Sequence, residues 1–163
     1  MDKLNNEVLP KVSHDKEARI GCKGKDKFWY GYKEHASVYM PSGLINKVVI
    51  TPANVSDGDG LKNVCPRSGA VYADKGYCSH KVHRTALQKG AHLRAILKNN
   101  MKAKNRDLDR WISGIRGPYE RIFSKRNKRV RYVGIVKNQF AALMHAITFN
   151  MKRLIELPTP KLA

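Results

Sequence analysis

The middle of the chain constrains the fold most strongly, because it predicts two parallel strands joined by a helix. The run Ala-Val-Tyr-Ala at residues 70–73 is short and uninterrupted, as in a buried strand. Ser79 is a suitable N-cap for a helix over residues 80–89, which Gly90 would end. Residues 91–97 predict the next strand, and the order strand, helix, strand gives a parallel crossover. The sequence therefore predicts a mixed α/β domain.

Upstream of this unit, the sequence predicts a loop and then a β-hairpin. Residues 1–27 are polar and rich in Lys, Asp and Gly, so we expect a loop there. Residues 28–38 are rich in aromatic side chains, residues 44–51 are rich in β-branched ones, and a Pro-Ser-Gly turn separates the two runs. Residues 53–69 hold many Asn, Asp, Gly and Pro residues and predict a loop with room for a short helix.

The C-terminal part of the chain is predicted to be helical. Apolar residues follow helical spacing from Asn105 onward, and Gly117 with Pro118 is expected to kink or restart that helix. A second helix is predicted over residues 137–155. One face of it carries mostly apolar side chains, namely Phe140, Leu143, Met144, Ile147, Asn150, Met151 and Leu154.

Positive charge is the main clue to a partner. The chain has 32 Lys and Arg residues against 13 Asp and Glu residues, a net charge of +19. This excess is more than solubility requires, and a polyanion would relieve the self-repulsion. Nucleic acid is therefore the predicted partner, and a solvated basic surface or a ribosome-associated protein is the alternative. No apolar run suggests a signal or a membrane span, so we expect a cytoplasmic protein.

The cysteines do not predict a disulfide framework or a zinc site. The chain has 3 cysteines, an odd number, and no CxxC pair. Cys78, His80 and His83 are close in sequence, but a structural zinc site needs a second pair of ligands, which is missing.

Two acidic residues are candidate metal ligands. Asp74 follows the strand at residues 70–73 directly, at the carboxyl end where α/β sheets gather functional groups. Alone, it is equally well interpreted as a turn residue that caps backbone amides. Glu120 lies in a basic helical stretch, where an ion pair is the simpler interpretation. Together, an aspartate at a strand end and a glutamate on a later helix can converge on Mg²⁺, which prefers carboxylate oxygens and serves phosphodiester chemistry.

Several segments, in chain order, resemble the catalytic core of DDE-type insertion-sequence transposases of bacteria. Residues 72–77 are similar to the second-aspartate motif, and residues 116–123 to the glutamate motif, in which an arginine lies four positions before the acid. The other matching segments are a strand beside the core at residues 28–33, the stretch before the second aspartate at residues 51–57, and the closing helix at residues 131–139 and 150–154. The resemblance extends from about residue 13 to residue 155.

This resemblance implies a ribonuclease-H-like α/β fold, a mixed sheet with flanking helices, and metal-dependent DNA cleavage and strand transfer during transposition. It implies that Asp74 and Glu120 are two of three ligands for Mg²⁺ or Mn²⁺, and that Arg116 supports the site. It also implies contacts with double-stranded DNA by the basic residues after Glu120, which are otherwise a solvated charge run: Arg121, Lys125, Arg126, Lys128, Arg129 and Arg131.

The chain departs from the family pattern at its start. The family's first aspartate lies on an opening strand upstream of residues 13–19, and the few residues before that point contain no aspartate on a convincing strand. Asp15 is the nearest candidate, in a loop-like setting. Asn127 occupies a position where the family often has lysine. We therefore expect a sheet without its opening strand.

The expected organisation is a loop-like segment at residues 1–27, a partial catalytic domain at residues 28–157 and a tail at residues 158–163. Such a chain would be inactive alone, would need its missing half in trans, or would act as a homodimer. The alternatives are a non-catalytic DNA-binding remnant that regulates transposition, and a small RNA-binding protein.

Overall fold

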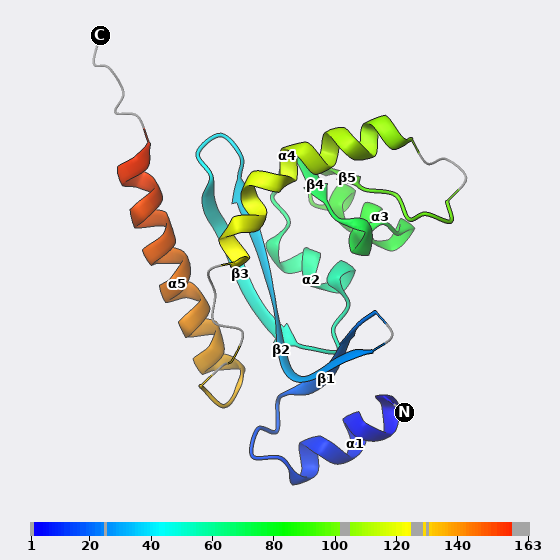
Figure 1. Cartoon of the computed structure of the whole chain (residues 1–163), viewed down its shortest axis with the longest axis vertical. Helices are drawn as coiled ribbons and strands as arrows, with labels where there is room; N and C mark the ends of the chain where they lie inside the picture. Colours follow the sequence, from blue (N-terminus) through cyan, green and yellow to red (C-terminus); the bar gives the residue numbers. More distant parts are fainter. Residues whose placement is uncertain (1, 25, 102–104, 125–128, 130, 158–163) are drawn as a thin grey trace.

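The computed structural model describes residues 2–24, 26–101, 105–124, 129 and 131–157. Figure 1 shows a long antiparallel hairpin, a smaller parallel unit beside it, and a C-terminal helix that lies along the outer side of the hairpin. This is the mixed α/β arrangement that the sequence predicts, consistent with a ribonuclease-H-like fold. None of the helices in these ranges is long and apolar enough to cross a membrane.

The predicted hairpin is confirmed. It consists of β2 (Lys27–Tyr39) and β3 (Leu44–Pro52), which pair antiparallel from Tyr32 to Tyr39. The first part of β2 pairs instead with β1 (Arg19–Lys23), which lies on the opposite edge of β2 from β3.

The prediction of a loop over residues 1–27 is wrong, because this segment contains the helix α1 (Asp2–Val12) as well as β1. The pairing of β1 depends on residues that follow it, which a local sequence pattern does not reveal. The side chain of Asn6 on α1 reinforces it, because its oxygen accepts the Ile20 amide at 2.7 Å and its nitrogen donates to the Ile20 carbonyl at 3.4 Å.

The parallel crossover is also confirmed. A short helix, α2 (Asp57–Val64), leads into β4 (Gly69–Ala73), the 3-10 turn η1 (Lys75–Tyr77), the helix α3 (His80–Gln88) and β5 (Ala91–Ala95). β4 and β5 pair in parallel. Ser79 caps α3 as predicted, since its hydroxyl accepts the Val82 amide. Apolar residues of α2, α3 and β5 form one core cluster with Ala73 of β4.

The helix α4 (Arg106–Ser124) continues through Pro118, so the predicted restart does not occur, although the helix bends along its length (Figure 1). A proline ring crowds the carbonyl four positions earlier, which belongs to Gly114, and a bend in the helix relieves this contact.

The predicted C-terminal helix is confirmed as α5 (Ile135–Glu156), but its large apolar side chains are not its buried face. Ala142 and Ala146 are buried against Ile45 and Val48 of β3, whereas most of the predicted apolar face, such as Phe140 at 64% exposure, faces solvent. Two side-chain amides complete the contact. Gln139 bonds the Ile50 amide and the Val48 carbonyl, and Asn150 bonds both backbone groups of Ile45.

Candidate active site at the end of β4

Asp74 lies directly after the last residue of β4, as the sequence predicts. Its Oδ1 accepts the backbone amide of Lys75 at 2.7 Å and so caps the turn η1. The predicted capping role is therefore present. The carboxylate remains accessible, because the Asp74 side chain is 59% exposed. The same carboxylate also contacts a helix from a distant part of the chain.

That helix is α4, which brings Arg116 and Glu120 to the end of β4. The Arg116 guanidinium lies between the two acids, with Nη1 3.8 Å from Asp74 Oδ1 and Nη2 3.5 Å from Glu120 Oε1. The Arg116 side chain is only 22% exposed, whereas that of Glu120 is 66% exposed. A partly buried arginine thus holds two solvent-facing carboxylates that are far apart in the sequence.

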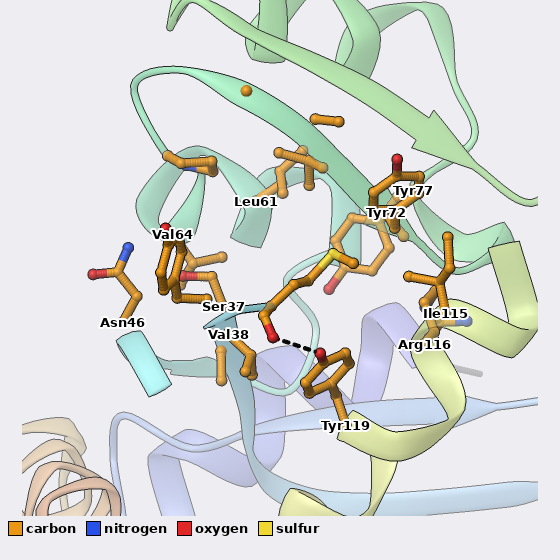
Figure 2. A pocket seen from close by; sticks show the side chains of 18 of the residues that line it. Ser37, Val38, Asn46, Leu61, Val64, Tyr72, Tyr77, Ile115, Arg116 and Tyr119 are labelled. Atoms are coloured by element: carbon orange, nitrogen blue, oxygen red, sulfur yellow. Dashed lines mark hydrogen bonds between the residues drawn. The ribbon is translucent and has the colours of Figure 1, made fainter. Parts of the chain in front are cut away.

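Two cavities border this group of three residues. The first, of about 570 Å³, lies between β2 and β4 and is mostly apolar; we call it the inner groove. The second, of about 630 Å³, lies on the other side of Asp74 and Glu120 and is more open; we call it the outer cleft. In Figure 2, Arg116, Ile115 and Tyr119 of α4 border the inner groove together with Tyr72 and Tyr77.

The outer cleft gathers basic side chains that the sequence did not predict as DNA contacts. Lys75 lines it beside Asp74, and Arg106 and Arg110 line it from the first turns of α4. The sequence could have identified this group, because helical spacing places four charged residues on one face of a helix: Arg106, Arg110, Arg116 and Glu120. Cationic side chains beside two carboxylates are suited to bind a phosphate group together with a metal ion.

Tyr77 lies deeper in the site, between the two sheets. Burial raises the pKa of Tyr77 to about 12, and the nearby charges of Asp57 and Asp74 act in the same direction. Its hydroxyl therefore stays protonated at neutral pH and can serve only as a neutral hydrogen-bonding group.

The two carboxylates fit a hard divalent cation, but they form an incomplete ligand set. Mg²⁺ is commonly held by one or two carboxylates with water and substrate phosphate completing its shell. Among the residues that the structure describes, no three His, Cys, Asp or Glu side chains gather in a way that could hold a metal ion. Asp74 and Glu120 are the two carboxylates that Arg116 brings together at this site.

Asp15, the weak candidate for a third ligand, is engaged elsewhere. Both of its carboxylate oxygens accept the Tyr32 hydroxyl at 2.7 Å, and Oδ2 accepts the Gly134 amide at 3.2 Å. Burial acts to raise the pKa of Asp15, but the hydrogen bonds from Tyr32 and from backbone amides outweigh it and lower the pKa below its ordinary value. Asp15 therefore stays ionised in a connection between β2 and the start of α5.

The basic stretch after Glu120 is only partly described. The predicted DNA contacts Lys125, Arg126 and Lys128 lie outside the described residues, as does the side chain of Arg121. Arg129 and Arg131 are exposed in the connection from α4 to α5. The assignment of these residues to DNA binding stays a prediction.

Residues 9–151 match the family model described as "Transposase DDE domain". This range contains Asp74, Arg116 and Glu120 and all of the strands. No curated protein and no solved structure matches the chain.

Proposed function

The chain belongs to the family of transposases with a DDE domain, and on that premise we propose that Asp74 and Glu120 hold Mg²⁺ or Mn²⁺ for DNA cleavage and strand transfer. The observation that carries the proposal is the shared contact with Arg116, at 3.8 and 3.5 Å, which brings the two acids to one place at a strand end. An aspartate that only capped η1 would not need a glutamate from α4 beside it.

In this proposal the three residues have distinct roles. Asp74 and Glu120 supply oxygen ligands, and Arg116 offsets the mutual repulsion of the carboxylates and keeps them close. A bound divalent cation would lower the barrier to attack on a phosphodiester and stabilise the leaving oxygen. Because Arg116 is mostly buried by its surroundings, its position is fixed before DNA binds.

The basic residues of the outer cleft would position the DNA backbone. Lys75, Arg106 and Arg110 line this cleft together with Asp74 and Glu120. Phosphate contacts of this kind position DNA without reading its sequence, and they weaken as salt concentration rises. We extend this contact surface to the predicted residues Arg129 and Arg131.

Two carboxylates are fewer than the three that the family resemblance implies, and Asp15 is committed to another contact. We therefore propose that full activity needs a third acidic side chain from a segment outside the described residues, and that this chain alone cleaves DNA weakly or not at all.

Cation binding tests the site without requiring turnover. We expect calorimetric titration with Mn²⁺ to show binding that Asp74→Asn and Glu120→Gln each weaken at least tenfold. Glu156→Gln is the matched control, since Glu156 is 65% exposed and pairs with Arg153 on α5 much as Glu120 pairs with Arg116. Equal Mn²⁺ binding by all three variants and the parent would exclude the proposed metal site.

A second candidate function is a DNA-binding regulator of transposition without catalysis. The incomplete ligand set favours it. In that case DNA binding should decrease steeply as salt concentration rises, and it should survive Asp74→Asn and Glu120→Gln. No metal-dependent nicking of plasmid DNA should be found, even when a peptide with an acidic residue is added. Nicking that both substitutions abolish would decide for the enzyme.

A further inference from the structure

The helix α2 packs closely between the hairpin and the parallel unit. It contacts β2 and β3 on one side, and α3 and η1 on the other (Figure 1). A Cβ atom added at Gly58 would meet Val82 of α3, and one added at Gly60 would meet the ring of His35 on β2. Glycine at both positions thus allows the close approach that fixes α2 between these elements.

Asp57, the first residue of α2, is held by a cation from β2. Its Oδ1 accepts a hydrogen bond from the Lys33 ammonium at 3.1 Å, and the same ammonium donates to the Val55 carbonyl at 2.9 Å. The Lys33 side chain is only 24% exposed, so water screens this ion pair less than a pair on the open surface. The Asp57 carboxylate therefore has a defined position.

The other carboxylate oxygen of Asp57 lies against the turn that follows β4. A Cβ atom added at Gly76 would lie 2.8 Å from Asp57 Oδ2. Gly76 is the middle residue of η1, and Asp74 is the N-cap of this turn. The Asp57 side chain thus occupies the space on one side of η1, and a glycine allows the turn to come this close.

Asp57 also acts electrostatically on a residue of the candidate site. Burial raises the pKa of Tyr77 to about 12. The charges of Asp57 and Asp74 act in the same direction, and that of Arg116 acts in the opposite one. The Tyr77 hydroxyl is therefore influenced by Asp57 and by two residues of the site together. A continuous connection runs from Lys33 through Asp57 and η1 to Asp74.

We propose that Asp57 is a positioning residue for the metal site. Its carboxylate, fixed by Lys33, holds η1 in place, and η1 determines where the Asp74 carboxylate lies relative to Arg116. The inference rests on the proposed function, and it gives Asp57 no contact with the metal ion or with DNA. Residues that orient metal ligands in this way typically contribute about 10–100-fold to metal affinity.

Asp59 provides the matched control. It is also an acid in the first turn of α2, and it also pairs with a lysine, Lys81, at 2.6 Å. Both acids stabilise the helix through its dipole. The Asp59 carboxylate contacts Ser56 and Lys81, whereas that of Asp57 lies against η1. A role limited to the stability of α2 would therefore affect both variants alike.

Calorimetric titration of the whole chain with Mn²⁺ tests the role of Asp57. Asp57→Ala should weaken Mn²⁺ binding at least about tenfold, and Asp59→Ala less than about twofold. Circular dichroism and urea unfolding show whether each variant folds, and Asp57→Asn, which keeps the side-chain volume and loses the charge, replaces Asp57→Ala if the latter does not. Unchanged binding in the Asp57 variant, or equal weakening in both, would overturn the proposal.

A substitution at Gly76 tests the contact itself. Gly76→Ala would displace η1 or the Asp57 side chain and should weaken Mn²⁺ binding about fivefold in the parent chain, but less than about twofold in Asp57→Ala, because both changes act on one contact. Additive effects of the two substitutions would contradict the proposal.

Hydrogen exchange without metal separates this inference from the proposed metal site. The Tyr77 amide donates to the Asp74 carbonyl at 3.0 Å within η1. Exchange at this amide, followed by NMR, should be at least about fivefold faster in Asp57→Ala than in the parent and unchanged in Asp59→Ala. An unchanged rate in Asp57→Ala would overturn the inference even if Mn²⁺ binds. If the parent binds no Mn²⁺, the metal site is refuted, and the exchange rate alone decides whether Asp57 holds η1.

Discussion

Replacing Asp15 with alanine should lower the free energy of unfolding by about 2–3 kcal/mol at pH 7. The carboxylate accepts the Tyr32 hydroxyl at 2.7 Å and the Gly134 amide at 3.2 Å, so it connects β2 with the N-terminal end of α5. Gly134 has no side chain to cap that helix. Loss of a helix cap costs about 1 kcal/mol, and loss of a hydrogen bond to a charged group about 1.5–3 kcal/mol, reduced here because the side chain is only half-buried.

The pH dependence shows whether the charge is responsible. The pKa of Asp15 is lowered in the folded protein relative to its ordinary value of 3.8. A group with a depressed pKa contributes stability above the unfolded pKa and loses it as pH falls through the folded pKa. The difference between the parent and Asp15→Ala should therefore be full above about pH 5 and shrink toward pH 2–3.

Urea unfolding followed by tryptophan fluorescence and circular dichroism measures both effects. Asp15→Asn is the matched control, because its single amide oxygen can still accept one of the two hydrogen bonds that connect β2 with α5, and we expect roughly half the loss. If Asp15→Ala unfolds within about 0.5 kcal/mol of the parent at pH 7, the connection contributes nothing and the reasoning is refuted. A difference that stays constant from pH 7 to pH 3 would show that the charge is not its source.

Three further changes test the packing of the sheet. Gly60→Ala would place a Cβ atom in contact with the buried His35 ring, so we expect thermal unfolding to show a loss of about 1–3 kcal/mol in stability. Gly114→Ala, in open space on α4, is the control and should be neutral or stabilising. Gln139→Leu leaves two backbone groups of β3 without their amide partner and should cost about 1–3 kcal/mol in urea unfolding; an unchanged midpoint would argue against this role. Burial lowers the pKa of His35, so the unfolded state binds the proton more readily than the folded state, and the free energy of unfolding should fall as pH decreases from 7 to 5. This pH dependence should disappear in His35→Gln. If it persists in that variant, another group is responsible for it.

Local patterns predicted the elements that depend on neighbouring residues. The hairpin of β2 and β3, the Ser79 cap and the parallel crossover follow from periodicity, turn residues and capping chemistry, which act over a few positions. The pattern was less informative where pairing partners lie elsewhere. β1 and α1 occupy a segment whose composition predicts a loop, because the pairing with residues 27–31 and the contact of Asn6 stabilise them.

The face of α5 shows a second limit of sequence patterns. Apolar spacing identified a helix and the side chains that share a face, but not which face β3 would contact. The small residues Ala142 and Ala146 allow close approach to β3, and Gln139 and Asn150 bond its edge, so the larger apolar side chains lie outside this contact.

The sequence by itself determined the family, the strand that places Asp74 at its carboxyl end and the helix that carries Arg116 and Glu120, because these are properties of short motifs. Only the tertiary structure decided that Arg116 contacts both acids, that Asp15 is bound to Tyr32 and Gly134, and that α2 lies against the turn η1. Each of these relations joins segments separated in the chain, and its geometry depends on how the sheets and helices pack.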